Sequence, residues 1–112
     1  MTAPDVRTGQ VWFVQLDPTV GHEQRGDRPA LVISSPEHLA LWNGRVAVVV
    51  PLTSQQKPFR FRPEVAPNSW AICDQPRTVD TRRFRRRATE LDPTPDTFAD
   101  VCTIVAKMIH TP

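Results

Sequence analysis

Lysine, cysteine and long apolar runs are all scarce in this chain. No stretch comes near the roughly 18 consecutive apolar residues that a membrane-spanning helix requires, and no charged-then-apolar signal segment opens the sequence. We therefore expect a cytoplasmic protein with no part in a membrane. The two cysteines, Cys73 and Cys102, form no Cys-x-x-Cys pair and lie in apolar surroundings, which favours buried reduced thiols over a disulfide.

Several patterns that mark catalytic chemistry are also missing. The chain contains no phosphate-binding P-loop and no Gly-x-Ser-x-Gly nucleophile motif. No cluster of His, Cys, Asp and Glu has the spacing of metal ligands, so we predict no metal site and no cofactor.

Arginine takes the place of lysine, because 12 of the 14 basic residues are arginines. A net charge of +2 does not by itself indicate a nucleic-acid-binding protein, but six arginines and one acid, Asp80, lie between Arg77 and Arg87. A guanidinium matches phosphate oxygens with a planar fork of donors, so the run 82–87 could neutralise RNA phosphates. The alternatives are a genome composition that favours arginine and a solvated hairpin anchored by Phe84.

The length fits a single domain over residues 1–112, with residues 1–6 as a loose tail. Short runs rich in β-branched and aromatic residues predict strands at residues 11–16, 29–34, 45–50, 59–62, 69–73 and 77–79. The second of these runs is nearly all apolar, which predicts burial on both faces. The spacing of the runs is typical of a mainly β (α+β) fold, built as a small barrel or a strongly bent sheet.

One long α-helix is predicted at residues 95–110, and a single helical turn at residues 36–42. Thr94 is a suitable N-cap and Pro95 suits the first helical position. Apolar residues then recur every three or four positions and form a stripe that should pack on the sheet: Phe98, Val101, Cys102, Val105, Met108 and Ile109.

The strongest candidate for chemistry is Arg28. It follows a loop with two glycines and precedes Pro29, which favours an extended backbone at the start of a buried strand. The alternative is a surface arginine in an ion pair with Asp27 or Glu23.

Thr53 and His22 are weaker candidates when each is considered alone. Thr53 follows an apolar run and should lie at the rim of the sheet, where hydroxyls usually bond to the local backbone. His22 lies in the loop before Arg28 and has an ordinary pKa near 6.5, which suits proton transfer.

Four segments, taken in order, are more specific than any one residue. They are Gly9-Gln10-Val11-Trp12, the segment 16–34 from Leu-Asp-Pro-Thr-Val-Gly-His to Arg-Pro-Ala-Leu-Val-Ile-Ser, Val49-Val50-Pro51-Leu52-Thr53-Ser54, and Asp74-Gln75-Pro76-Arg77-Thr78-Val79-Asp80. In this order they resemble the MazF/PemK/Kid family of toxin endoribonucleases across residues 9–84. Two departures from the family pattern are Pro76, where Ile or Leu is common, and His22, where Ser is frequent.

The resemblance implies an SH3-like barrel of short, mostly antiparallel strands with a C-terminal helix. It also implies a homodimeric, metal-independent endoribonuclease that acts on single-stranded RNA and is blocked by a cognate, MazE-like antitoxin. Arg28 and Thr53 match the positions associated with catalysis in the family, and His22 is our candidate base. The expected RNA-binding residues are Glu23, Gln24, Arg25, Ser54, Gln55, Gln75, Arg77, Arg82, Arg85 and Arg86.

Two other functions remain open at this point. The related gyrase poisons share the fold but act on a protein through an aromatic-bearing C-terminal end, whereas this chain ends in Met-Ile-His-Thr-Pro. The second alternative is a non-catalytic barrel that binds RNA through its arginines.

Overall fold

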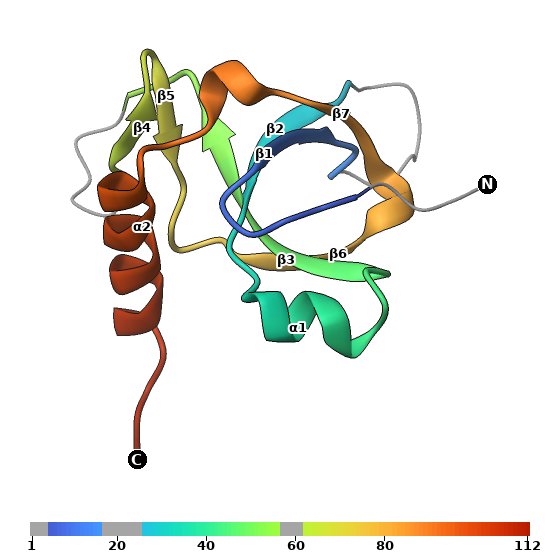
Figure 1. Ribbon diagram of the computed structural model, residues 1–112. Helices are drawn as coiled ribbons and strands as arrows, with labels where there is room; N and C mark the ends of the chain where they lie inside the picture. Colours follow the sequence, from blue (N-terminus) through green and yellow to red (C-terminus); the bar gives the residue numbers. More distant parts are fainter. Residues whose placement is uncertain (1–4, 17–25, 57–61) are drawn as a thin grey trace.

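The computed structural model describes residues 5–16, 26–56 and 62–112 of the chain. Within these residues the chain forms one antiparallel sheet of seven strands and two α-helices (Figure 1). The elements are β1 (Val11–Val14), β2 (Arg28–Val32), α1 (Pro36–Leu41), β3 (Val46–Thr53), β4 (Glu64–Ala66), β5 (Ser69–Ala71), β6 (Arg77–Asp80), β7 (Phe84–Arg87) and α2 (Pro95–Lys107).

The long strand β3 joins the parts of the sheet. One of its edges pairs with β2, while the other pairs with β6 over residues 46–49 and then with β5 at residues 52 and 53. The strand order is β4-β5-β3-β2-β1-β7, with β6 beside β3, and the sheet curls round on itself (Figure 1). The expected bent, mainly β fold with a C-terminal helix is confirmed, although the described strands do not close into a complete barrel.

The sheet buries apolar side chains on both of its faces. In β2, Ala30 and Val32 belong to one buried cluster and Leu31 to a second, and all three are fully buried. The prediction for this strand is therefore confirmed. Val101 and Val105 of α2 pack into the second cluster, so the helix covers the face of the sheet to which Leu31 points.

The helix α2 begins where the sequence predicts and ends three residues early. The side chain of Thr94 accepts a hydrogen bond from the Thr97 N–H, and Lys107 is the last helical residue. The chain then runs away from the sheet (Figure 1), so Met108 and Ile109 are 38% and 66% exposed. The last two members of the apolar stripe therefore do not pack.

The strands differ from the prediction in several places, and β2 and β5 each end two residues before their predicted ends. β3 continues past Val50 to Thr53, and within it the Pro51 carbonyl accepts a hydrogen bond from the Ile72 N–H at 2.9 Å. β4 and β7 were not predicted, because β4 has only three residues and β7 is mostly arginine. The strand expected at residues 59–62 lies outside the described residues except for Arg62, which belongs to no strand.

The packed part of the chain begins earlier than the predicted tail allows. Val6, which we assigned to the loose tail, is buried in the first core cluster, while its neighbour Asp5 is exposed. Residues 1–4 of the predicted tail lie outside the described residues.

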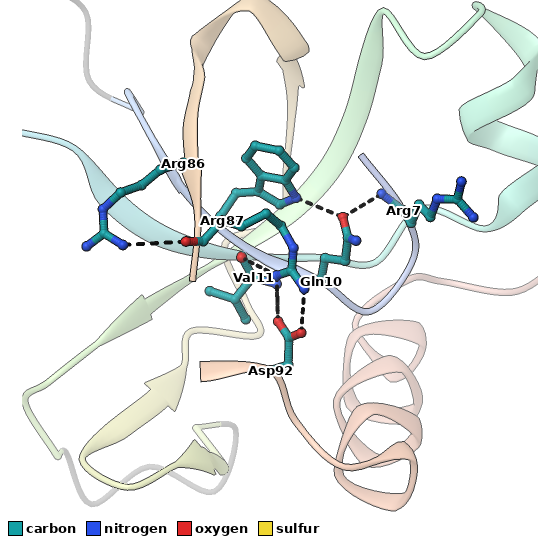
Figure 2. Close-up of polar contacts among 7 residues, drawn as sticks. Arg7, Gln10, Val11, Arg86, Arg87 and Asp92 are labelled. Carbon is teal, nitrogen blue, oxygen red and sulfur yellow. Dashed lines mark hydrogen bonds and ion pairs between the residues drawn. The ribbon is translucent and has the colours of Figure 1, made fainter. Parts of the chain in front are cut away.

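An ion pair joins β1, β7 and the segment that leads into α2. The Arg87 guanidinium donates to both carboxylate oxygens of Asp92, at 2.9 and 2.8 Å, and to the Val11 carbonyl at 2.9 Å (Figure 2). The Val11 N–H donates to the same carboxylate at 2.7 Å. Burial raises the pKa of Asp92, but these hydrogen bonds outweigh burial and hold that pKa below its ordinary value.

Both cysteines are free thiols, as expected. Cys73 is buried, and burial together with the nearby Asp74 and Cys102 raises its pKa to about 11. Cys102 is partly buried, and burial raises its pKa too. Both thiols therefore stay protonated near neutral pH, which makes them poor nucleophiles. Among the described helices, none has the length and apolar character needed to cross a membrane.

Candidate active site

A cleft opens where β2 and β3 stop pairing. The ladder between them ends at Ala30 and Pro51. The Ile33 N–H donates to the Val48 carbonyl, which makes these two residues a hydrogen-bonded pair. In an antiparallel ladder every second pair is of this kind, so in this register the next ones are Leu31 with Val50 and then Pro29 with Leu52. Pro29 has no N–H to donate, so the ladder is not continued there.

Beyond this point the two strands keep different neighbours. Arg28 pairs with Val14 of β1, whereas Thr53 pairs with Trp70 of β5. The cleft between the strand ends has a volume of about 390 Å³ and is lined by Arg28, Pro29, Leu52, Thr53, Ser54, Gln55, Ser69 and Ile72.

The cleft brings together four residues that the sequence analysis selected from two distant segments: Arg28, Thr53, Ser54 and Gln55. It also contains residues that the analysis missed. Ser69 and Ile72 come from β5 and the residue after it, and only the pairing of β5 with β3 brings them here. No local motif marks either residue, so no sequence signal could have identified them.

Arg28 is available to a ligand. Its side chain is exposed, and among the described residues it forms no hydrogen bond or ion pair. The proposed alternative, an ion pair with Asp27, is wrong, because the Asp27 carboxylate lies 3.7 Å from Nε of Arg85. Glu23, the other candidate partner, lies outside the described residues, as do His22, Gln24 and Arg25.

Thr53 combines a local hydrogen bond with access to the cleft. Its Oγ1 accepts a hydrogen bond from the Gln55 N–H at 3.1 Å. This contact uses a lone pair of the oxygen, so the hydroxyl proton remains available to donate to a ligand. Ser54 and Gln55 follow on the same wall of the cleft and are exposed.

The arginine run does not line the cleft, and its members have partners within the protein. Arg82 donates three hydrogen bonds to the Asp80 carboxylate, at 2.8 to 3.1 Å. These bonds, together with one from the Arg82 backbone N–H at 2.8 Å, lower the pKa of Asp80 to about 2. Arg85 donates to the side chain of Gln15 at 2.7 Å.

Arg86 of β7 is paired with Phe13 of the neighbouring strand β1, and its guanidinium carbon lies 4.1 Å from the centroid of the Phe13 ring. Figure 2 shows it on the opposite side of β7 from the Arg87 guanidinium. Phe84 is buried and packs edge-on against Trp12 at 5.7 Å, so it anchors the run in the way that the hairpin alternative proposed. Gln75 and Arg77 are exposed at the start of β6, outside the cleft lining.

A metal ion would find no ready site in the part of the chain that the structure describes. These residues contain no group of three or more His, Cys, Asp or Glu side chains able to hold one. The groups in the cleft are instead a guanidinium, hydroxyls and an amide, which donate hydrogen bonds to an anion such as a phosphate.

The sequence and the fold match those of known proteins. Residues 7–109 match the family described as PemK-like, MazF-like toxin of type II toxin-antitoxin system. Endoribonuclease PemK of Escherichia coli is 36% identical over 104 residues, covering 84% of this chain and 74% of the relative. Endoribonuclease EndoA of Bacillus subtilis (strain 168) is 31% identical over 96 residues, covering 78% and 81%.

Solved structures give the same result. The chain aligns with one titled MazE-MazF (Form-II) from Deinococcus radiodurans at a TM-score of 0.72 and 28% identity, covering 96% of both chains. A mycobacterial endoribonuclease in complex with its cognate antitoxin gives a TM-score of 0.72 at 19% identity, covering 96% of this chain and 99% of the other, which supports the fold alone. The chain therefore belongs to the PemK-like, MazF-like family of toxins of type II toxin–antitoxin systems.

Proposed function

We propose that this chain is a sequence-specific endoribonuclease toxin that cuts single-stranded RNA without a metal ion. The observation that carries the proposal is the cleft, where the guanidinium of Arg28, which has no partner among the described residues, and the hydroxyl of Thr53 come from different strands to one cavity. Membership of the toxin family and two relatives named endoribonucleases support it.

The reaction begins with attack of a ribose 2′-hydroxyl on the adjacent phosphorus. The bond from the 2′-oxygen to phosphorus forms while the bond to the 5′-oxygen breaks, the 2′-hydroxyl proton passes to a base, and the departing oxygen takes up a proton from water. Negative charge gathers on the phosphoryl oxygens, where Arg28 donates hydrogen bonds. Removing such a preorganised donor typically costs about 3–4 kcal/mol of transition-state stabilisation.

Each side chain has one role in this scheme. A guanidinium is cationic and only donates hydrogen bonds, so Arg28 stabilises negative charge and donates a hydrogen bond toward the leaving oxygen instead of acting as a base. The Thr53 hydroxyl donates a hydrogen bond to the scissile phosphate and so orients the phosphate. The Gln55 N–H donates to Oγ1 of Thr53 and fixes that oxygen in place. We propose His22, outside the described residues, as the base that accepts the 2′-hydroxyl proton.

Cleavage should proceed in EDTA and should stop when the ribose at the cut site lacks its 2′-hydroxyl. The physical reason is that the attacking oxygen comes from the substrate and the charge is stabilised by a side chain. The measurement is gel analysis of a labelled single-stranded RNA and of the same RNA with one 2′-deoxy residue at the mapped cut site. A deoxy substrate that is still cut at that site would exclude this route, and uncut RNA that is nevertheless bound would favour a binding module.

We further propose that the protein is a homodimer in solution and that a cognate antitoxin inhibits it. The relatives support the second proposal, because the aligned structures include one titled MazE-MazF (Form-II) and one titled as an endoribonuclease in complex with its cognate antitoxin. An antitoxin segment with acidic and apolar residues suits the cleft, since carboxylates can replace phosphate at Arg28 while apolar side chains pack on Leu52 and Ile72.

RNA and antitoxin should therefore compete for the protein. Titrating antitoxin into a complex of the toxin with fluorescently labelled, non-cleavable 2′-deoxy-substituted RNA should release the RNA, as followed by fluorescence polarisation. Unchanged polarisation at saturating antitoxin would show that the two ligands use separate surfaces. Light scattering on the free toxin at micromolar concentration gives its mass, and a monomer there would contradict the dimer.

A further inference from the structure

Arg85 occupies an irregular position in the sheet. Along the pairing of β1 with β7, Phe13 lies opposite Arg86 and Val14 lies opposite Phe84. Arg85 is therefore the extra residue of a β-bulge. A bulge bends its strand and changes the direction of the side chain that it carries.

From this bulge Arg85 reaches across the end of β1 to the residue before Arg28. Its guanidinium donates to the Gln15 side chain at 2.7 Å, and its Nε lies 3.7 Å from a carboxylate oxygen of Asp27. Both charged side chains of the pair are a little under half exposed, so the contact is accessible to solvent. The guanidinium thus connects three parts of the chain at one end of the sheet.

Little else holds Asp27 in place within the described residues. Gly26, the preceding residue, has a φ of +121°, and a side chain added there would meet no atom within 4 Å. Such a backbone is permissive and unpacked. The contact with Arg85 is therefore the restraint that the structure shows on the Asp27 side chain.

An unrestrained carboxylate at this position would interfere with the cleft. Asp27 adjoins Arg28, so a free carboxylate could pair with the Arg28 guanidinium or repel an incoming phosphate. Exposed ion pairs of this kind are worth up to about a fivefold change in an equilibrium. Pairing Asp27 with Arg85 removes both effects.

We propose that Arg85 is a positioning residue that holds and neutralises Asp27, which keeps the Arg28 guanidinium free for phosphate. The inference rests on the proposed RNA cleavage, but it assigns Arg85 a role different from that of a phosphate ligand. Another arginine in an exposed ion pair, Arg7 with Asp5 at 3.1 Å, lies near the N-terminal end and gives a matched control.

The test is a double-mutant cycle on kcat/KM for RNA cleavage. Arg85→Ala should lower kcat/KM roughly threefold to fivefold, while Arg7→Ala, which removes the same charge from the same kind of pair, should leave it unchanged. Asp27→Asn should have little effect in the wild-type protein but should restore most of the loss in the Arg85→Ala background.

A phosphate contact predicts a different pattern. Asp27→Asn would then raise kcat/KM by the same factor in the wild-type and the Arg85→Ala proteins. Arg85→Ala would also reduce the slope of log K for RNA binding against the logarithm of the salt concentration by about one. Either result would overturn the proposal. If the wild-type protein did not cleave RNA, the proposed function would fail, but the inference would still be tested by NMR.

The NMR readout is the Nε–H signal of the Arg28 guanidinium in the free protein. It should shift in Arg85→Ala, because Asp27 then pairs with Arg28, and should return in the Arg85→Ala/Asp27→Asn protein. An Arg28 signal that does not move in Arg85→Ala would show that Arg85 does not control Asp27, whatever the activity of the protein.

Discussion

Replacing Arg28 with alanine should reduce kcat for RNA cleavage by about 10²- to 10³-fold and leave the protein folded. The loss is large because the guanidinium supplies the positive charge in the cleft where the phosphoryl oxygens become more negative. The free energy of unfolding should change by no more than about 0.5 kcal/mol, because the side chain is exposed and has no partner among the described residues. Single-turnover cleavage and thermal unfolding measure the two effects separately.

Two further variants identify the cause of the loss. Arg28→Lys keeps the charge but not the planar pair of donors, so it should recover only part of the rate. Thr53→Val removes the hydroxyl at nearly constant volume and should also slow cleavage. A folded Arg28→Ala protein with near-wild-type turnover would falsify the assignment of Arg28.

Replacing Asp92 with asparagine should destabilise the fold by about 2–3 kcal/mol, which lowers Tm by roughly 10 °C. The substitution removes the charge that Arg87 binds with two hydrogen bonds and leaves that guanidinium partly buried without a counter-ion. The matched control is Asp5→Asn, because Asp5 also pairs with an arginine but is 79% exposed. We expect the control to change stability by less than 1 kcal/mol.

The pH dependence distinguishes this ion pair from simple packing. The pKa of Asp92 is lower in the folded protein than its ordinary value, so its contribution is present in full above that ordinary value of about 3.9 and is lost as the pH falls further. The stability gap between wild type and Asp92→Asn should therefore be widest near neutral pH and should narrow below about pH 4. A gap that stays constant down to pH 2 would mean that the carboxylate charge does not stabilise the fold.

The local patterns of the sequence were sufficient for the elements with a strong apolar signal. The run of Val residues in β3, the apolar β2 and the capped α2 were all expected near their observed positions. β7 was not, because it is stabilised by its pairing with β1 and by side-chain contacts to that strand, Phe84 on Trp12 and Arg86 on Phe13. Contacts over such distances in the sequence leave no periodic pattern.

The candidate site could also be predicted only in part. The order of motifs selected Arg28 and Thr53, and the structure places both in one cleft. The arginine run was interpreted from its charge alone, and charge does not reveal that Arg82 and Arg85 are already paired with Asp80 and Asp27. The contact of Arg85 with Asp27 depends on the bulge and on strand register, which the sequence does not display.

The proline at position 29 has a consequence for how this protein can be stabilised. Any residue with an N–H at that position could donate to the Leu52 carbonyl and extend the β2–β3 ladder by one hydrogen-bonded pair. The added bonds would strengthen the sheet and draw together the two strand ends that form the cleft. Selection for thermal stability at this position would therefore act against the opening that admits a ligand, so a more stable protein would be a less active one.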